Sequence, residues 1–170
     1  PPRTTATPAS GAELILSTVR SHPGQVTLVA VGRLTNLALA LALEPRLPEL
    51  AKEVVLMGGS AFAGGNVTPL AEANIWGDPH AADIVFAAPW RVTMVGLDVT
   101  TRVRLTDERL LRMAQKDDRV GAFLYRISRF YKQFHDTTGV TGGFYVHDPS
   151  AVAYAIDPSL FTTEAASVRV

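Results

Sequence analysis

The residues best suited to chemistry lie in one stretch, 56–83, which reads LMGGSAFAGGNVTPLAEANIWGDPHAAD. Asn66, Glu72 and Asn74 occur within nine residues, after a loop with four glycines. Amides and carboxylates form paired hydrogen bonds with neighbouring hydroxyl groups, and glycines let the backbone approach a ligand closely. This spacing is typical of a polar cup for a small polyhydroxylated ligand. The alternative is a surface loop whose Asn and Gly residues form turns for local reasons.

A second group of candidate residues lies near the pair His147-Asp148. Histidine exchanges protons near neutral pH because its unperturbed pKa is about 6.5. Asp148 precedes Pro149 and is expected to be the N-cap of a helix, although a carboxylate also suits a hard cation. A surface histidine beside a helix cap is the alternative. Tyr131 and His135 border a polar loop, 135–143, and are expected to close over a ligand.

Two further carboxylates have more than one interpretation. Asp98 follows a predicted strand and lies near Thr100 and Thr101, which fits either a site residue or a strand-terminal turn. Asp78 precedes Pro79, a pairing that favours a helix cap over a catalytic role.

The predicted elements place these side chains along one edge of a sheet. Residues 26–31, 53–57 and 91–97 are nearly continuous apolar runs, typical of strands covered on both faces. A helical pattern at 12–20 precedes the first strand, and further helical patterns, including 36–43 and the segment that starts at Pro79, separate the strands. The alternation predicts an α/β domain with a mainly parallel sheet, whose ligands bind beyond the carboxyl ends of the strands.

The flanking segments complete the expected organisation. Residues 1–11 are expected to be a tail or loop, and 12–170 a single α/β domain. Thr106 is expected to cap a helix, and a longer helix is expected at 119–134. The apolar stripe of that longer helix is expected to serve in packing. Residues 167–170 resemble the start of a further strand.

Composition narrows the class of partner. The 16 basic and 16 acidic side chains cancel, so no broad field attracts nucleic acid or an anionic membrane. The absence of cysteine excludes disulfides, thiolate catalysis and cysteine-bound zinc, and is compatible with the cytoplasm. No apolar run approaches the roughly 20 residues of a membrane span. We therefore expect a cytoplasmic protein without nucleic-acid or membrane partners.

Four ordered segments carry a resemblance to a known family: VAVGRLTNLALAL (29–41), VVLMGGSAFAGGNVTPLAEANIWGDPHAADIVF (54–86), VTMVGLDVT (92–100) and VHDPSAVAYAIDPSLF (146–161). They are similar to successive motifs of the inosine-uridine type nucleoside hydrolases, which cleave the N-glycosidic bond of purine or pyrimidine ribonucleosides to ribose and free base. The resemblance implies an open, Rossmann-like sheet flanked by helices, and commonly a homo-oligomer. It departs at Arg33, where the family has proline, and at Ala73, where it has phenylalanine.

The resemblance also implies roles for individual residues. His147 resembles the histidine that assists departure of the base. The expected substrate-binding residues are Met57, Asn66, Glu72, Asn74, Tyr131 and His135. Asp148 and the backbone carbonyl of Val31 resemble ligands of a catalytic calcium ion, consistent with the oxygen ligands that this hard cation prefers.

One family motif is absent from these 170 residues. The Asp-rich motif of the form DTDPGxDDA, which supplies the other calcium carboxylates and the catalytic base, is not found. We therefore expect an incomplete calcium site, and the chain is interpreted as a central to C-terminal portion of the family fold. The alternative to a hydrolase is a catalytically inactive fragment that binds ribose or nucleoside weakly, or only self-associates.

Overall fold

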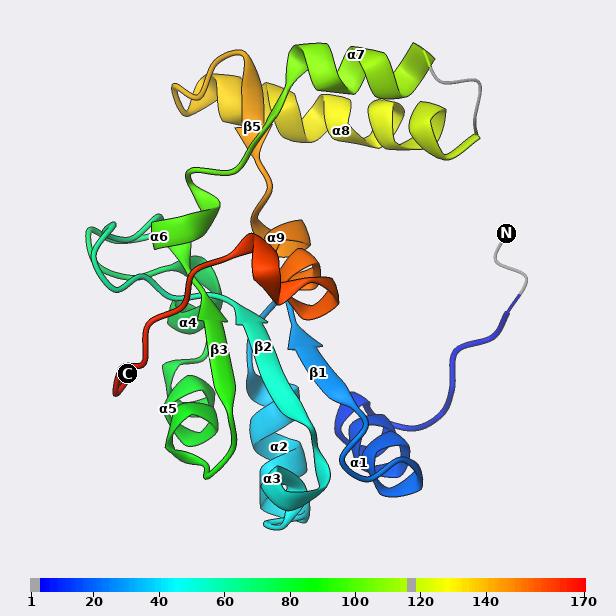
Figure 1. The fold of residues 1–170 in the computed structure, drawn as a ribbon, viewed down its shortest axis with the longest axis vertical. Coiled ribbons are helices and arrows are strands. Elements are labelled where there is room, and N and C mark those ends of the chain that lie inside the picture. The colour runs from blue at the N-terminus through cyan, green and yellow to red at the C-terminus, as the bar shows by residue number, and fades with distance from the viewer. Residues whose placement is uncertain (1–3, 116–118) are drawn as a thin grey trace.

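The computed structural model describes residues 4–115 and 119–170. Its centre is a parallel three-stranded sheet in the order β1 (Thr27–Ala30), β2 (Glu53–Met57) and β3 (Val92–Val95) (Figure 1). The register sets Ala30 beside Leu56, and Leu56 beside Met94, so the three strands end at a common edge. The α/β fold with an open, mainly parallel sheet flanked by helices is confirmed.

Helices cover both faces of this sheet. The first face is covered by α1 (Gly11–Ser21), α2 (Thr35–Leu43), α3 (Leu47–Leu50) and α5 (Pro79–Ala87), and the second by α9 (His147–Ile156) (Figure 1). Val54 and Leu56 pack in the first core, whereas Val55 and Met57 pack in the second. Successive side chains of a strand point to opposite faces, so a strand buried on both must be apolar throughout.

β1 departs from the expectation that it is covered on both faces. In the described residues it pairs only with β2, and Val29 is 38% exposed. The prediction was wrong because an apolar run does not show how completely each face is covered: α9 contacts β1 but leaves Val29 on that face exposed. β1 leaves one row of backbone hydrogen-bonding groups without a neighbouring strand in the part of the chain that the structure describes.

A helical hairpin extends beyond the carboxyl edge of the sheet. α7 (Asp107–Gln115) and α8 (Arg119–Thr137) lie side by side, joined to the rest of the chain through the antiparallel strands β4 (Arg104–Thr106) and β5 (Gly143–Tyr145) (Figure 1). The Arg109 amide donates to Thr106 Oγ1 over 3.3 Å, as expected of a helix cap. A cavity of about 660 Å³ lies between the helices, and neither His147 nor Glu72 lines it.

The apolar stripe of α8 is exposed, contrary to the expectation that it serves in packing. Phe130 is 82% exposed, and Val120, Phe123, Ile127 and Phe134 are also exposed. α7 and β5 contact α8, but they leave this stripe uncovered within residues 4–115 and 119–170. An amphipathic pattern records which face of a helix is apolar, not whether a neighbour is present to cover it.

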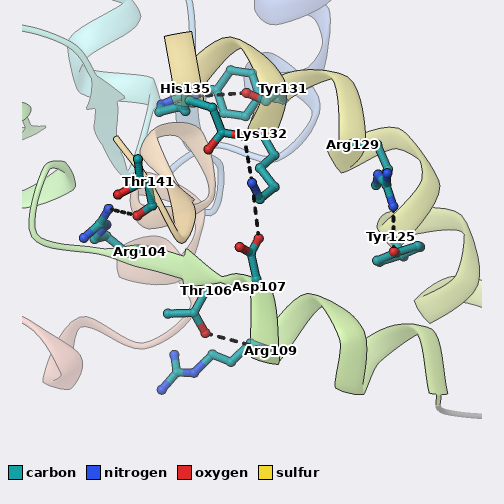
Figure 2. A network of polar contacts seen from close by, with 11 residues as sticks. Arg104, Thr106, Asp107, Arg109, Tyr125, Arg129, Tyr131, Lys132, His135 and Thr141 are labelled. Carbon is teal, nitrogen blue, oxygen red and sulfur yellow. Dashed lines mark hydrogen bonds and ion pairs between the residues drawn. The ribbon is translucent and has the colours of Figure 1, made fainter. Parts of the chain in front are cut away.

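Polar contacts fix the orientation of the hairpin, as Figure 2 shows. Lys132 Nζ lies 3.7 Å from Asp107 Oδ1 and 2.8 Å from Asp136 Oδ2, so it joins the two helices. Arg104 Nη2 donates to the Thr141 carbonyl over 2.8 Å and ties β4 to the segment before β5. These contacts join α8 to α7 and β4 to the segment before β5.

Three local expectations are corrected. Residues 135–137 belong to α8, so the expected loop at 135–143 begins later. α9 begins at His147 with Val146 as its N-cap, so Asp148 lies in the first turn and is not the cap. Residues 167–170 form no strand.

The remaining elements are short. α4 (Ala73–Trp76) and α6 (Leu97–Thr100) follow β2 and β3 respectively, and the 3-10 helix η1 (Pro158–Leu160) follows α9. No helix within residues 4–115 and 119–170 has both the length and the apolar character needed to cross a membrane.

Candidate functional site

Glu72 closes the glycine-rich loop that follows β2. Its side chain is only 3% exposed, and Oε2 accepts hydrogen bonds from the backbone amides of Gly59 (2.9 Å), Asn74 (2.9 Å) and Ile75 (3.2 Å). The same carboxylate therefore caps α4 and joins its first turn to the end of β2. Charge-assisted hydrogen bonds to several donors make burial of this anion tolerable.

The two asparagines also hold the loop through one polar atom each. Asn66 Oδ1 accepts from the Ala73 amide at 2.9 Å. Asn74 Nδ2 donates to the Met57 carbonyl at 3.0 Å, and the Met57 side chain is buried in the core on the α9 face, with its sulfur 3.5 Å from Asn74 Nδ2. The alternative interpretation of this stretch, a loop whose Asn residues serve local turns, is thus partly correct, because both side-chain amides stabilise the backbone of the loop.

Each of these side chains keeps a second polar atom unpaired. Within residues 4–115 and 119–170, Asn66 Nδ2, Glu72 Oε1 and Asn74 Oδ1 have no hydrogen-bond partner. Among the same residues, Ser60 Oγ is the buried side-chain polar atom that lacks a partner, so Glu72 Oε1 and Asn74 Oδ1 are not sealed from solvent. One donor and two acceptors are therefore available to hydroxyl groups of a ligand.

Two glycines are required by the shape of this loop. Gly59 has φ +78°, a left-handed conformation that other residues rarely adopt. A Cβ at Gly65 would overlap the carbonyl oxygens of Thr68 and Ala71. The turn that brings Asn66 back toward α4 thus requires a residue without a side chain at position 65.

Asp98 anchors the outer part of the same loop. Oδ1 accepts from the amides of Phe62 (2.7 Å) and Ala63 (2.8 Å), and Oδ2 accepts from Ala61 (2.8 Å). Partial burial acts to raise the pKa of Asp98, but these N–H groups together outweigh it and leave the pKa below its ordinary value. The sequence signal was a carboxylate directly after a strand, which did not distinguish a loop anchor from a base.

Asp78 caps α5, as predicted. Its Oδ1 accepts from the Ala81 amide at 3.0 Å, and its Oδ2 accepts from the Thr35 hydroxyl at 2.5 Å. Both oxygens of Asp78 have partners, as do both oxygens of Asp98. Neither carboxylate is free to act as a base in this arrangement.

His147 begins α9 above the carboxyl ends of the strands. Its Nδ1 lies 2.7 Å from Thr100 Oγ1, and Thr100 is fully buried at the end of α6. Burial and the neighbouring His135 lower the pKa of His147, against the opposing charge of Glu72. Both effects favour the neutral form of the imidazole. Thr100 is a site residue whose role the sequence pattern did not indicate.

Asp148 lies next to this histidine and close enough to Glu72 for their charges to interact. Loss of hydration raises the pKa of Asp148, and the charge of Glu72 raises it further. Two carboxylates near one another are a place where a cation would be stabilised.

The proposed calcium ligands do not form a cation site by themselves. Val31 directly follows β1, which α9 contacts, so its carbonyl lies on the same edge as Asp148. Calcium takes about six to eight oxygen ligands. Among the described residues no group of three or more His, Cys, Asp or Glu side chains is arranged to hold a metal. A carboxylate and a carbonyl do not fit the requirement.

Tyr131 and His135 lie on the α8 side of His147. His135 is only 5% exposed, and its Nδ1 lies 3.1 Å from the Tyr131 carbonyl (Figure 2). Its ring centroid is 6.5 Å from that of His147. Burial raises the pKa of the Tyr131 phenol, as does the charge of Asp148. The structure brings both residues to the His147 region, but His135 is held among aromatic rings and not in a loop.

The fold and these side chains define an open α/β protein with a polar site beyond the carboxyl ends of its parallel strands. The family model described as "Inosine-uridine preferring nucleoside hydrolase" matches residues 1–170. The chain belongs to this family.

Relatives and solved structures agree with that assignment. An inosine-uridine preferring nucleoside hydrolase of Crithidia fasciculata is 46% identical over 158 residues, covering 92% of this chain and 50% of the relative. Uridine nucleosidase 1 of Arabidopsis thaliana is 38% identical over 170 residues, covering 100% of this chain and 51% of the relative. A purine-preferring ribonucleoside hydrolase structure from Gardnerella vaginalis matches with a TM-score of 0.94 and 37% identity, covering 99% of this chain and 54% of that one. The chain spans about half the length of the relatives it matches.

Proposed function

We propose that this chain binds the ribose of a ribonucleoside and supplies the leaving-group side of N-glycosidic bond hydrolysis, the reaction that yields ribose and a free base. The carrying observation is the set of unpaired polar atoms around the glycine-rich loop, together with a neutral histidine at the same sheet edge. The names of the relatives, which include inosine-uridine, uridine and purine preference, support the substrate class.

The ribose hydroxyls would be held by Asn66, Glu72 and Asn74. Glu72 Oε1 and Asn74 Oδ1 would accept hydrogen bonds from hydroxyl groups, and Asn66 Nδ2 would donate one. Because the partner atom of each side chain is already fixed to the backbone, little rotamer freedom remains to be lost on binding. Met57 would supply a buried apolar side chain next to Asn74 of this loop.

His147 would assist departure of the base. Breaking a ribosyl bond passes through an oxocarbenium-like state in which the leaving base gains electron density. A neutral imidazole that donates an N–H hydrogen bond to that base stabilises the developing charge and lowers the barrier. Tyr131 and His135, which lie beside His147, would bound the space that the base occupies.

Attack of water is the step that the described residues do not supply. The carboxylates of Asp98 and Asp78 are both occupied by backbone donors and hydroxyl groups. We further propose that calcium binding would need ligands in addition to Asp148 and Val31. This gap favours the second candidate, a chain that binds ribose or nucleoside without cleaving it.

One pair of measurements separates the two candidates. The chain is incubated with inosine or uridine, with and without calcium, and base release is followed by chromatography, while ribose binding is followed by ligand-detected NMR. If the chain is a hydrolase, His147→Ala should lower base release by about 100- to 1,000-fold, the usual effect of removing one hydrogen-bond donor that stabilises charge in the transition state, and retain ribose binding.

His22→Ala is the matched control, because His22 is exposed at the C-cap of α1 and precedes β1, far in sequence from the loop. It should change neither measurement. Ribose binding that Glu72→Gln weakens, with no base release at high protein concentration, would establish the binding-only candidate. Absence of both binding and release would refute the proposal.

A further inference from the structure

Thr100, on α6, contacts His147, the first residue of α9. Thr100 is the last residue of α6, immediately after β3, and is fully buried. Its Oγ1 lies 2.7 Å from His147 Nδ1, across 47 positions of sequence. This short hydrogen bond fixes the orientation of the imidazole ring. Which of the two atoms donates determines which ring nitrogen carries the proton.

Two directions of this hydrogen bond are possible. If Nδ1–H donated to Oγ1, the buried Thr100 hydroxyl would still need an acceptor for its own hydrogen. Within residues 4–115 and 119–170 it has no other partner. The nearby Leu97 carbonyl already accepts from the amide and hydroxyl of Thr101. Donation from Thr100 to an unprotonated Nδ1 satisfies both groups, and a buried donor without a partner is costly.

The other ring nitrogen is open. His147 Nε2 has no hydrogen-bond partner among the described residues, and it is not among the buried polar atoms without one. A proton placed on Nε2 is therefore available to a ligand.

We infer that Thr100 is a positioning residue: its hydroxyl donates to His147 Nδ1 and holds the neutral imidazole as the Nε2–H tautomer. The relevance of this tautomer to base departure rests on the function proposed above. Nε2–H can donate to a lone pair on the leaving base, such as a ring nitrogen or a carbonyl oxygen. The opposite tautomer would present a lone pair to a lone pair.

The tautomer can be read directly from the nitrogen chemical shifts of the imidazole. The chain is labelled with ¹⁵N-histidine, and long-range proton–nitrogen correlations are recorded without nucleoside at about pH 8, above the ordinary histidine pKa. The chain has four histidines, and His147→Gln assigns the signals of the one in question. We expect the Nε2–H pattern, with Nδ1 shifted as a hydrogen-bond acceptor.

Thr100→Val removes the hydroxyl and keeps the branched shape. The Nδ1 and Nε2 shifts should then approach one another as the two tautomers mix, whereas Thr100→Ser should retain the wild-type pattern. Thr101→Val is the matched control, because the Thr101 hydroxyl donates to the Leu97 carbonyl and does not contact His147. It should leave the pattern unchanged.

Two results would overturn the inference: an Nδ1–H pattern in the wild-type chain, or an unchanged pattern in Thr100→Val. A purely structural role for Thr100 would lower stability and leave the tautomer unchanged. If Thr100→Val does not fold, the wild-type and Thr100→Ser spectra still decide. Because no nucleoside is present, failure of the proposed function leaves this result intact.

Discussion

At the scale of single residues, Asp98 shows how a side chain can serve a site without facing a ligand. Its two oxygens accept three consecutive backbone amides, 61–63, on the outer part of the glycine-rich loop. Two residues further along α6, Thr100 contacts His147. One short helix after β3 therefore positions both the glycine-rich loop and His147.

Replacing Asp98 with Asn should loosen the loop. The amide keeps one acceptor oxygen, loses the charge, and turns an NH₂ group toward backbone donors. We expect a decrease of about 1–3 kcal/mol in the free energy of unfolding, the usual cost of losing hydrogen bonds to a charged group. Urea denaturation measures this change. Asp83→Asn on α5 is the control, since Asp83 makes no hydrogen bond or ion pair in the described residues, and equal effects in both variants would contradict the anchor role.

The same anchor predicts a pH dependence. The pKa of Asp98 is lower in the folded chain than its ordinary value of 3.8, so the unfolded state takes up the proton first. The stabilisation is therefore complete above the ordinary pKa and is lost as the pH falls through the lowered folded value. Unfolding experiments between pH 6 and about pH 2.5 should show a smaller loss for Asp98→Asn than for wild type. A parallel loss in both would exclude this residue as the source.

At the scale of elements, the conformation of the loop between β2 and α4 depends on Gly65. Glu72 and Asn74 reach their positions only because residues 64–71 fold back tightly, with the amides of Gly65 and Asn66 donating to the Pro69 and Ala71 carbonyls. A methyl group at Gly65 has no space in this turn.

Gly65→Ala should therefore weaken ribose binding and lower the free energy of unfolding by about 1–3 kcal/mol, the cost of forcing a backbone shift. Calorimetry and ligand-detected NMR measure the two effects. Gly32→Ala is the matched control for stability, because nothing lies within 4 Å of a Cβ built there and its φ is ordinary. Unchanged ribose binding in Gly65→Ala would show that the loop conformation does not determine the sugar site.

At the scale of the whole molecule, the β1 edge of the parallel sheet is a surface that another chain could pair with. β1 has a sheet neighbour on one side only in the described residues, and Val29 and Val31 are both exposed. A groove of about 390 Å³ runs along it, lined in part by these residues and by Ile15 of α1. Unpaired apolar edges favour pairing with another strand.

We therefore expect concentration-dependent self-association through β1, in line with the homo-oligomer that the family resemblance implies. Val29→Lys should shift the chain toward monomer in sedimentation velocity, because a charged side chain on an edge strand opposes pairing. Leu39→Lys on α2 is the control, an equally apolar and exposed position away from the edge. Association that both variants reduce alike would point to general stickiness and not to this edge.

The periodic features of the fold were predictable from local sequence. The strand at 53–57 matches β2 to the residue, and its uninterrupted apolar run correctly indicated burial on both faces. The cap of α5 by Asp78 and of α7 by Thr106 also followed from short motifs. These features depend on neighbours within about four residues, whose geometry the backbone dictates.

Features that depend on distant neighbours were not predictable in the same way. The apolar stripe of α8 and the exposed face of β1 look like core residues in sequence, and only the absence of a covering element in the described structure distinguishes them. The placement of His135 in a helix, and not in a loop, follows from packing against Tyr131 and Phe144.

The sequence by itself determined the order of the main elements, the family, and the candidate site residues at 66–74 and His147. Tertiary structure alone decided which atoms of those residues are free, because each polar atom either meets a backbone partner or does not. It showed that Asp98 holds a loop and that Thr100 supports His147. Such contacts join residues 35 to 47 positions apart, and local periodicity carries no information about them.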